Sequence, residues 1–533
     1  MDILFIYPPI SVNERYVISA GKTGGNLPPL GIAQLSSYLR EKGVKVGLID
    51  SVIEDFSIDQ IVEKVFEFNP KIIGFSALTP NFHRAAAFAA LIKKSRPEIL
   101  IILGGHHATI LPKEILEQND YFDLIVYGEG ELTAEEIIDK YKKSGWRKNV
   151  FLNDYNMLSG INGITFRRGK EVVITPPREL IQNLDELPFP AWDLLPMNKY
   201  IPLPNQYKRT PVINMVVIRG CPFNCSFCSN NSVFGRKIRA MSPKRVVEQI
   251  RHVMKNYGIR EISFWDDMMT ANKKWMYEFC DSLIKNKIDI TWTCYSRVDC
   301  VDEEILRHMR RAGCWNIFFG YESGCQELLN NINKGTTLKQ IEVANMLCKK
   351  VGIEIRASFM IALPGETPEM AKKTIDFAKK LNPDYDKNQA RPFTFALGQG
   401  MFLKGVEDYI LEKGEIGKNY TIEILPESAF GFRQAQFVQL IPMRIFVQQK
   451  INPVHGMAFN FDGRIGKVIS VSGGRILVDF NHPLAGKKLI YDIKILKKIE
   501  DQNEKTKSFI DFLFKRELTF EIKNEDLFVK VEK

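Results

Sequence analysis

Apolar and polar positions alternate with a regular rhythm over the first 130 residues. Short apolar runs, typical of strands buried on both faces, are separated by longer segments with the three- and four-residue apolar spacing of helices. The strands are expected at DILFIYPP, VKVGLID, KIIGFSA, ILIILGG and DLIVYG, and the helices at LGIAQLSSYLREKG, IDQIVEKVFEFN, AAAFAALIKKSR and near PKEILEQN. This order predicts an α/β, doubly wound, Rossmann-like domain over residues 1–144.

The rhythm stops and then resumes. Residues 145–205 contain seven prolines with little sustained periodicity, which predicts a connector. Over residues 206–386 five strands return, each followed by a helix, the last of which is PEMAKKTIDFAKKLN. The strands are VINMVVIRG, EISFWDD, DITWTCYSR, WNIFFGYES and EIRASFMIAL. Five βα units in series predict a partial (βα) barrel with its functional groups at the carboxyl ends of the strands.

The last third of the chain has a different pattern. After Pro383 the βα rhythm ends, and the sequence becomes rich in glycine and in strand-forming residues, with GRIGKVISVSGGRILVDF as a hairpin signature. A domain boundary is therefore expected at 384–392, with a β-rich α+β domain after it.

Composition restricts the class of protein. The chain has 533 residues, which is too long for a single hydrophobic core. Its residues are 45% hydrophobic and 26% charged, a composition typical of soluble proteins. No apolar stretch approaches the roughly 20 residues of a membrane span, and MDILFIYPPI lacks the flanks of a signal peptide. The net charge of +10 is spread along the chain, so no nucleic-acid surface is indicated. We expect a cytoplasmic protein.

The cysteines are clustered. All nine lie between Cys221 and Cys348, which favours a local metal site in a reducing compartment over disulfides. CPFNCSFC places Cys221, Cys225 and Cys228 in a loop after the first barrel strand. Three such thiolates can hold three irons of a cubane cluster and leave the fourth open to a cofactor. A zinc site with a distant fourth ligand, or three buried cysteines, is the alternative.

This motif, with Phe227 before its last cysteine, resembles the signature of the radical S-adenosylmethionine (SAM) superfamily. The resemblance implies that the three cysteines hold a [4Fe-4S] cluster and that SAM chelates its open iron through the methionyl amine and carboxylate. One electron, supplied by a donor such as ferredoxin or flavodoxin, would then cleave SAM to a 5'-deoxyadenosyl radical.

The ends of the other strands add to this resemblance. Asp266 and Asp267 in FWDDMMT would contact the methionyl amine, since carboxylates suit an ammonium group. Arg297 in SRVD would pair with the SAM carboxylate. Glu322 in GYESG would reach the ribose or methionine, and Ile361 lies in the segment expected near adenine. Each could instead be a solvated turn residue.

The first domain resembles the cobalamin-binding domain of a large radical SAM subgroup, through PPLGIAQLSSYLREKG, VGLID, GFSALTPNF, LGGHHAT and YGEGE. The implied cobalamin contacts are Ser76, Thr79, Gly104, Gly105, His106, Gly128 and Glu129. No Asp-x-His-x-x-Gly stretch supplies a lower axial histidine, so a domain without a cofactor stays an alternative. His106 and His107 are expected to diverge in an extended segment, and His83 to be structural at a helix start.

The C-terminal third resembles the FKBP-type peptidyl-prolyl isomerases of the long archaeal and SlyD-like kind. The implied parts are a truncated isomerase domain at 388–497, an inserted flap at about 432–479 and a C-terminal module at 498–533. Such catalysis uses an apolar pocket that favours the twisted amide. The matching pocket residues are Phe402, Leu403, Val406, Phe430 and Tyr491, with Val406 in place of an aromatic floor.

Both resemblances are incomplete at the same place. PDYDK runs directly into NQARPFTF, where a sixth βα unit and the first FKBP strands would be expected. A junction between two truncated parents explains both gaps. The leading hypothesis is a cobalamin-dependent radical SAM enzyme for methyl transfer or ring formation on a small-molecule or cofactor-like substrate. The alternatives are an isomerase or chaperone acting on unfolded or proline-containing polypeptides, and an inactive fusion.

Overall fold

The computed structural model divides the chain into two compact units, Met1–Asp386 and Lys387–Lys533. The division lies within the range where the sequence places a domain boundary. The structure describes residues 1–9 and residues 25–381, except for 55, 57, 204 and 205. It also describes residues 397–398, 402–448, 453, 458–461, 464–472, 474–482, 484–514, 519–523 and 526–530.

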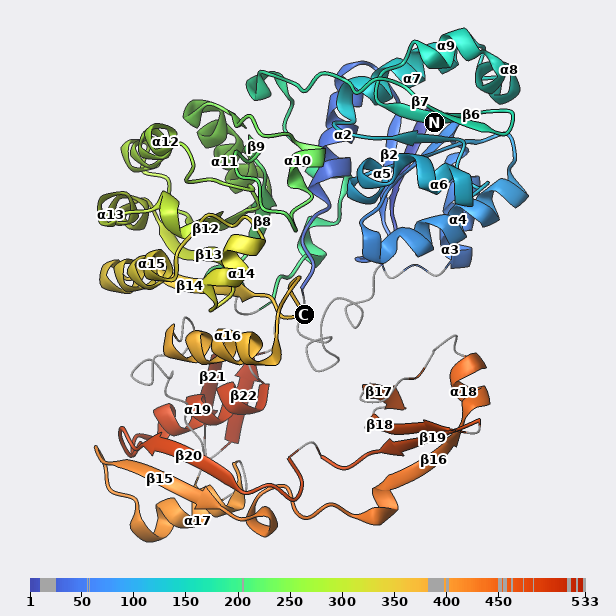
Figure 1. Ribbon diagram of the computed structural model, residues 1–533. Coiled ribbons are helices and arrows are strands. Elements are labelled where there is room, and N and C mark those ends of the chain that lie inside the picture. Colours follow the sequence, from blue (N-terminus) through green and yellow to red (C-terminus); the bar gives the residue numbers. More distant parts are fainter. Residues whose placement is uncertain are drawn as a thin grey trace. The chain divides into compact units, whose positions relative to one another are not determined.

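The first unit begins with a seven-stranded sheet in the order β2-β1-β3-β4-β5-β6-β7 (Figure 1). Its five parallel strands are β1 (Ile3–Tyr7), β2 (Val46–Asp50), β3 (Ile72–Ser76), β4 (Leu100–Gly104) and β5 (Leu124–Val126). The helices are α2 (Leu30–Glu41), α3 (Ile58–Phe68), α4 (Phe82–Ser95), α5 (His106–Ile110), α6 (Pro112–Gln118) and α7 (Glu131–Lys143). The doubly wound domain predicted from the sequence is confirmed.

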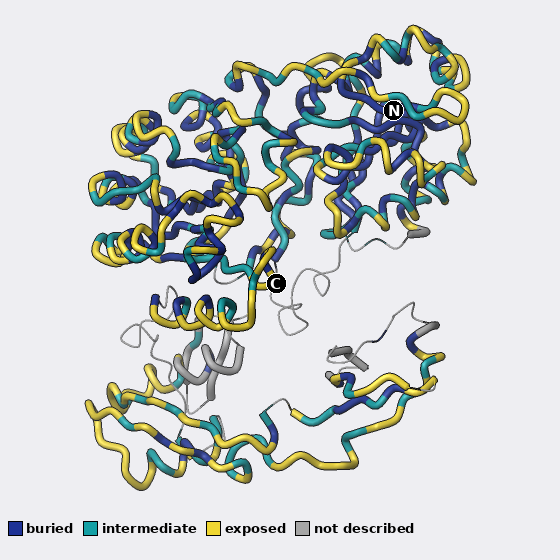
Figure 2. The backbone as a smooth tube through the Cα atoms, viewed as in Figure 1, coloured by how far each residue is buried: buried dark blue, intermediate teal, exposed yellow. Residues whose placement is uncertain are grey.

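Both faces of this sheet are buried. Along β1, Ile3 and Phe5 belong to one apolar cluster, whereas Leu4 and Ile6 belong to another. Successive strand residues point to opposite faces, so helices must cover both sides. Figure 2 shows the strands as the buried layer inside more exposed helices.

The predicted connector is wrong in its first half. Residues after 144 form α8 (Lys148–Asn153), α9 (Tyr155–Ser159) and a hairpin of β6 (Ile164–Arg168) and β7 (Glu171–Ile174). β6 pairs antiparallel with β5 and so extends the first sheet. The part of the predicted connector that follows β7 packs along α2, where Arg40 forms a bidentate ion pair with Asp193 at 2.6 and 2.9 Å.

The second sheet is parallel, in the order β14-β13-β12-β11-β8. Its strands are β8 (Val212–Met215), β11 (Glu261–Phe264), β12 (Thr291–Ser296), β13 (Cys314–Glu322) and β14 (Glu354–Phe359). Its helices are α11 (Pro243–Tyr257), α12 (Lys273–Lys285), α13 (Glu303–Arg311), α14 (Gln326–Asn331), α15 (Leu338–Val351) and α16 (Pro368–Leu381). The five predicted βα units are confirmed.

The first predicted barrel strand is interrupted. β8 ends at Met215, and a separate short strand, β9 (Ile218–Arg219), pairs antiparallel with β10 (Arg239–Ala240). Between β9 and β10 lie the cysteine motif and the short helix α10 (Asn230–Val233). This small hairpin projects the cysteine loop from the carboxyl end of β8.

The second unit is β-rich. α17 (Lys404–Lys413) precedes β15 (Asn419–Ile424), which pairs antiparallel with β20 (Leu489–Lys494). Between these strands, in the predicted flap, lies a sheet ordered β16-β19-β18-β17. It comprises β16 (Val438–Pro442), β17 (Ala458–Phe461), β18 (Arg464–Ser472) and β19 (Arg475–Asp479), with α18 (Met443–Gln448) after β16. The chain continues with α19 (Gln502–Phe514) and the pair β21 (Thr519–Lys523) and β22 (Asp526–Lys530). In the described ranges, no helix has the length and apolar character needed to cross a bilayer.

Candidate active site

The three motif cysteines lie on the loop between β9 and α10. Cys221 and Cys225 are partly buried and Cys228 is exposed. The amide of Cys221 donates to the carbonyl of Gly235 at 3.2 Å, and that of Cys228 to the carbonyl of Cys225 at 3.2 Å. The backbone of the loop is thus held while its thiols stay close to the surface.

The other cysteines differ in environment. Cys280, Cys294, Cys314 and Cys348 are buried in the barrel core. Burial raises the pKa of Cys348 to about 12, far from the thiolate form that binds metals. In the part of the chain that the structure describes, no three His, Cys, Asp or Glu side chains converge as on one metal ion. A cubane cluster places its cysteine ligands on separate irons.

Arg297, just beyond β12, supplies positive charge to the loop. Its Nη1 lies 3.6 Å from Cys225 Sγ, and its guanidinium lies 3.6 Å from the centroid of the Phe223 ring. Nε and Nη2 donate to the two carboxylate oxygens of Asp299, at 3.0 and 2.9 Å. Through these contacts Arg297 holds the cysteine loop at both Cys225 and Phe223. Asp299 was missed as a site residue, although it stands in the same SRVD motif.

The two aspartates after β11 have different environments. Asp266 is buried, and its Oδ1 accepts the amides of Val217 and Ile218 at 2.6 and 2.5 Å. Burial raises its pKa to about 7. These bonds fix the turn before the cysteine loop, and the contact of Asp266 with the methionyl amine stays a prediction. Asp267 is less enclosed; burial raises its pKa to about 6, partly offset by Asn230 and the Gly220 amide. Asp267 remains the better candidate for the amine.

Glu322 ends β13 and is paired inside the protein. Its Oε1 accepts from Lys334 Nζ at 2.7 Å and its Oε2 from Ser358 Oγ at 3.1 Å. Its φ of +62° coincides with the register shift between β13 and β14. Lys334 lies 5.7 Å from the centroid of the Phe227 ring, which links this pair to the cysteine loop. Lys334 carried no signal in the sequence.

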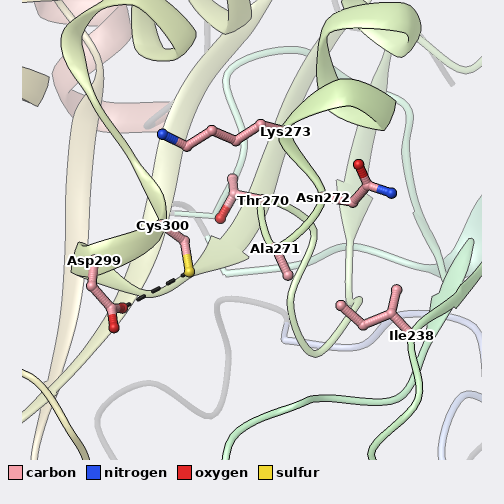
Figure 3. Close-up of a pocket in the computed structure, with 7 residues that line it drawn as sticks. All are labelled: Ile238, Thr270, Ala271, Asn272, Lys273, Asp299 and Cys300. Atoms are coloured by element: carbon pink, nitrogen blue, oxygen red, sulfur yellow. Dashed lines mark hydrogen bonds between the residues drawn. The ribbon is translucent and has the colours of Figure 1, made fainter.

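Phe227 and Ile361 remain reachable at the same end of the barrel, since they are 43% and 54% exposed. A pocket of about 530 Å³ opens beside the loops that follow β11 and β12 (Figure 3). Its lining residues are Ile238, Thr270, Ala271, Asn272, Lys273, Asp299 and Cys300. The carboxyl ends of these strands therefore border open space next to Arg297 and its partner Asp299.

The carboxyl edge of the first sheet collects most of the residues expected to contact cobalamin. Ser76 and Gly104 end β3 and β4, and Gly105, with φ of +94°, precedes α5. The amide of Gly128 donates to Thr109 Oγ1 at 3.1 Å, and a Cβ at Gly128 would meet nothing within 4 Å. Among the described residues, the backbone just after β5 therefore has free space beside Gly128.

The histidines of this edge are not arranged as expected. His106 and His107 lie on the helix α5, so the predicted extended segment is wrong. His107 Nδ1 lies 3.1 Å from Oγ1 of Thr79, another expected contact. His106 faces the barrel, where its ring centroid is 6.4 Å from that of Phe234. Burial lowers the pKa of both histidines, which favours neutral imidazoles.

Glu129 has partners other than the predicted cofactor. Its carboxylate accepts from Arg219 at 2.9 Å, from Arg239 at 2.8 and 3.0 Å, and from the amide of Ile181 at 2.8 Å. These donors come from the barrel and from the segment that leads to it. Glu129 therefore connects the first sheet to the cysteine hairpin, and its contact with cobalamin stays a prediction.

In the second unit, four of the five expected pocket residues form one apolar cluster. Val406 is buried there, and Phe402, Leu403 and Tyr491 pack against it. The rings of Phe402 and Tyr491 meet edge to face at 5.9 Å. Phe430 instead stacks on His482, with ring centroids 3.9 Å apart.

Comparison with known families gives three matches. Residues 16–138 match the B12 binding domain, residues 215–378 the radical SAM superfamily, and residues 439–484 the FKBP26 IF domain. The first match covers β2 to β5 of the first sheet, the second covers most of the five-stranded sheet, and the third lies over the flap sheet.

Individual relatives agree with this division. An uncharacterized methyltransferase of Pyrococcus horikoshii is 37% identical over 385 residues, which cover 72% of this chain and 79% of that protein. An anaerobic magnesium-protoporphyrin IX monomethyl ester cyclase of Rubrivivax gelatinosus is 34% identical over 72% of this chain and 66% of its own length. The radical SAM methyltransferase TsrM of Kitasatospora setae shares the fold, with a TM-score of 0.58 over 72% of both chains at 16% identity.

Proposed function

Because the chain belongs to the radical SAM proteins that carry a B12-binding domain, we propose that it is a cobalamin-dependent radical SAM enzyme. Its reaction is methyl transfer or ring formation on a small-molecule substrate. The observation that carries the proposal is the cysteine loop, which presents three thiols beside Arg297 at the carboxyl ends of the barrel strands.

The donor set fits a [4Fe-4S] cluster held by Cys221, Cys225 and Cys228. When bound, the cluster and SAM supply a 5'-deoxyadenosyl radical, and cobalamin supplies a methyl carrier. Arg297 lies against Cys225 and stacks on Phe223, so it holds the loop. Asp267 offers a carboxylate to an ammonium group, and the exposed rim of Phe227 and Ile361 offers apolar surface to a nucleoside.

The first domain supports cobalamin binding through the carboxyl edge of its sheet. Among the described residues, nothing lies within 4 Å of the Cβ position of Gly128, so a ligand can approach the backbone there. The side chains of His107 and Thr79 are hydrogen-bonded to each other on the same edge. The proposed partners of the whole protein are a small-molecule substrate and a one-electron donor of the ferredoxin or flavodoxin kind.

Anaerobic reconstitution with iron and sulfide tests the proposal. The wild-type chain should turn brown and, under reduction, form 5'-deoxyadenosine from SAM, and it should retain added hydroxocobalamin on gel filtration. The variant with Cys221, Cys225 and Cys228 all changed to alanine should lose colour and SAM cleavage. Cys300→Ala is the matched control, since it removes a partly buried thiol near the loop and should keep both. A colourless wild type, or a triple variant that behaves like it, would reject the function.

A second activity, prolyl isomerisation, is favoured by the apolar cluster around Val406. Phe402 and Tyr491 form an aromatic wall, as an apolar pocket for a twisted amide requires. The full chain should accelerate proline-limited refolding of a model protein, and Phe402→Ala should abolish that acceleration. Equal refolding rates with and without the chain would reject this activity without affecting the first proposal.

A further inference from the structure

A buried network of four charged side chains joins the first sheet to the cysteine hairpin. Glu129 and Glu131 come from the β5–α7 loop and the start of α7, Arg219 from β9 and Arg239 from β10. Arg219 donates to Glu129 at 2.9 Å and to Glu131 at 2.7 Å, and Arg239 donates to both oxygens of Glu129. The side chains are between 2% and 11% exposed.

The charges in this network balance, two against two. An isolated buried charge is costly, and a buried pair is tolerated only where its geometry and additional hydrogen bonds compensate for lost water. Here Arg239 also donates to the carbonyls of Ile181 at 2.6 Å and Phe234 at 3.1 Å. A shifted arrangement would leave one of these charges buried and unpaired, which is strongly destabilising.

The network contacts both strands of the cysteine hairpin. Arg219 precedes Cys221 by two residues, and Arg239 lies directly opposite Arg219 in the β9–β10 ladder. The loop between them is closed by the bond from Cys221 to Gly235. The two arginines therefore fix both ends of the segment that carries all three thiols.

The same contacts reach the carboxyl edge of the first sheet. Phe234 lies below the guanidinium of Arg219 at 5.6 Å and faces the ring of His106 at 6.4 Å. His106 belongs to α5, which begins directly after Gly105 at the end of β4, and α10 packs against α5. The hairpin and the candidate cobalamin edge are thus held together by protein contacts.

We propose that Glu129 and Glu131 are positioning residues for the cysteine loop, because their ion pairs with Arg219 and Arg239 set its place against the first domain. The inference rests on the proposed function in so far as the loop carries the cluster. The ion pairs themselves involve only protein atoms, so the loop should hold its place before any cofactor binds.

Hydrogen exchange on the cofactor-free full-length chain tests this directly. Glu129→Gln keeps the size of the side chain but leaves Arg239 without a carboxylate, so exchange across residues 216–240 should rise about tenfold. Exchange in α2 and α11 should not change. The matched control is Glu136→Gln, which changes a carboxylate on the adjoining helix α7 that pairs with Lys140 and Arg178. Equal exchange in wild type and E129Q, or an equal rise in E136Q, would overturn the proposal.

A second variant and a spectroscopic readout separate positioning from simple stabilisation. Glu131→Gln leaves Arg219 paired with Glu129, so its effect on the loop should be intermediate and the protein should remain folded. After reconstitution, the electron paramagnetic resonance signal of the reduced cluster, with and without SAM, should change in E129Q and stay as in wild type in E136Q. If the variants have a lower melting temperature than the wild type but the same exchange pattern and the same spectrum, the network contributes to stability alone. A wild type that takes up no cluster would reject the function and leave the exchange result standing.

Discussion

A single buried carboxyl, that of Asp266, controls the turn ahead of the cysteine loop. Burial raises its pKa to about 7, although two amides donate to the same oxygen. Since the unfolded chain titrates near the ordinary value, the folded state binds the extra proton between about pH 4 and pH 7. The free energy of unfolding should therefore fall as pH rises through that window and level off above it.

Asp266→Asn should remove this pH dependence, because an amide oxygen still accepts the two amides without becoming charged. Relative to wild type, its free energy of unfolding should rise by about 2–3 kcal/mol between pH 5 and pH 8. Urea unfolding of the cofactor-free protein at several pH values measures the difference. Asp139→Asn, which removes an exposed carboxyl on α7, is the control. If the difference in free energy of unfolding between D266N and wild type does not widen as pH rises, the raised pKa of Asp266 is contradicted.

The pair of Glu322 and Lys334 makes a second prediction at this scale. Both side chains are 7% exposed, so Glu322→Gln leaves a buried ammonium without its partner. Unfolding should become easier by roughly 3–5 kcal/mol, measured by chemical denaturation. The double variant with Lys334→Met removes both charges and should recover most of that loss. If the double variant is no better than the single one, the cost does not arise from the unpaired charge.

Glu129 illustrates what the sequence could predict at single residues. The motif YGEGE placed it correctly at the carboxyl edge of β5, because that edge follows from the order of strands and helices. Its partners Arg219 and Arg239 stand about 100 residues later in the chain. Nothing in local pattern reports such a pairing, so its burial and its ion pairs became visible only in the structure. The same holds for Lys334 opposite Glu322.

Among the elements, the β9–β10 hairpin depends on one glycine. Gly220 has φ of +96°, and a Cβ there would lie 2.3 Å from the carbonyl oxygen of Lys237. Gly220→Ala should therefore force the two strands apart next to Cys221 and reduce iron and sulfide per chain at least severalfold after reconstitution.

Gly169→Ala separates conformational strain from this clash. Gly169 also has a positive φ, of +62°, but a Cβ there would meet nothing within 4 Å. It lies in the turn between β6 and β7, away from the loop. Iron content should stay near the wild-type value in G169A. Equal losses in both variants would mean that left-handed backbone, and not the contact with Lys237, limits cluster binding.

Strand periodicity predicted the elements of both parallel sheets, since long apolar runs leave few alternatives. It failed for β6 and β7, where the strands are short and the outer one is half exposed, with exposed residues at both ends. Prolines downstream of Ile174 reinforced the interpretation as a connector. The split of the first barrel strand into β8 and β9 was missed for a related reason, because both pieces are apolar and only their pairing partners differ.

At the scale of the molecule, the change of sequence pattern after Pro383 predicted where the units divide, but not how unequal their cores are. The first unit buries one large apolar cluster that includes residues of both parallel sheets. The described clusters of the second unit are small, centred on Val406, Ile422 and Ile424 and on Phe446, Val468 and Ile476. Small cores give marginal stability, so the second unit should be the weaker one.

A chain that ends at Asp386 tests this division. Because every residue proposed for cluster and SAM binding lies in the first unit, the truncated chain should take up the cluster and form 5'-deoxyadenosine within about twofold of the full-length rate. In calorimetry the full-length chain should unfold in two steps, since separate cores break two-state behaviour. The truncated chain should retain only the step at higher temperature. A single cooperative transition of the full chain, or a truncated chain that fails to fold, would mean that the first unit does not fold independently of the second.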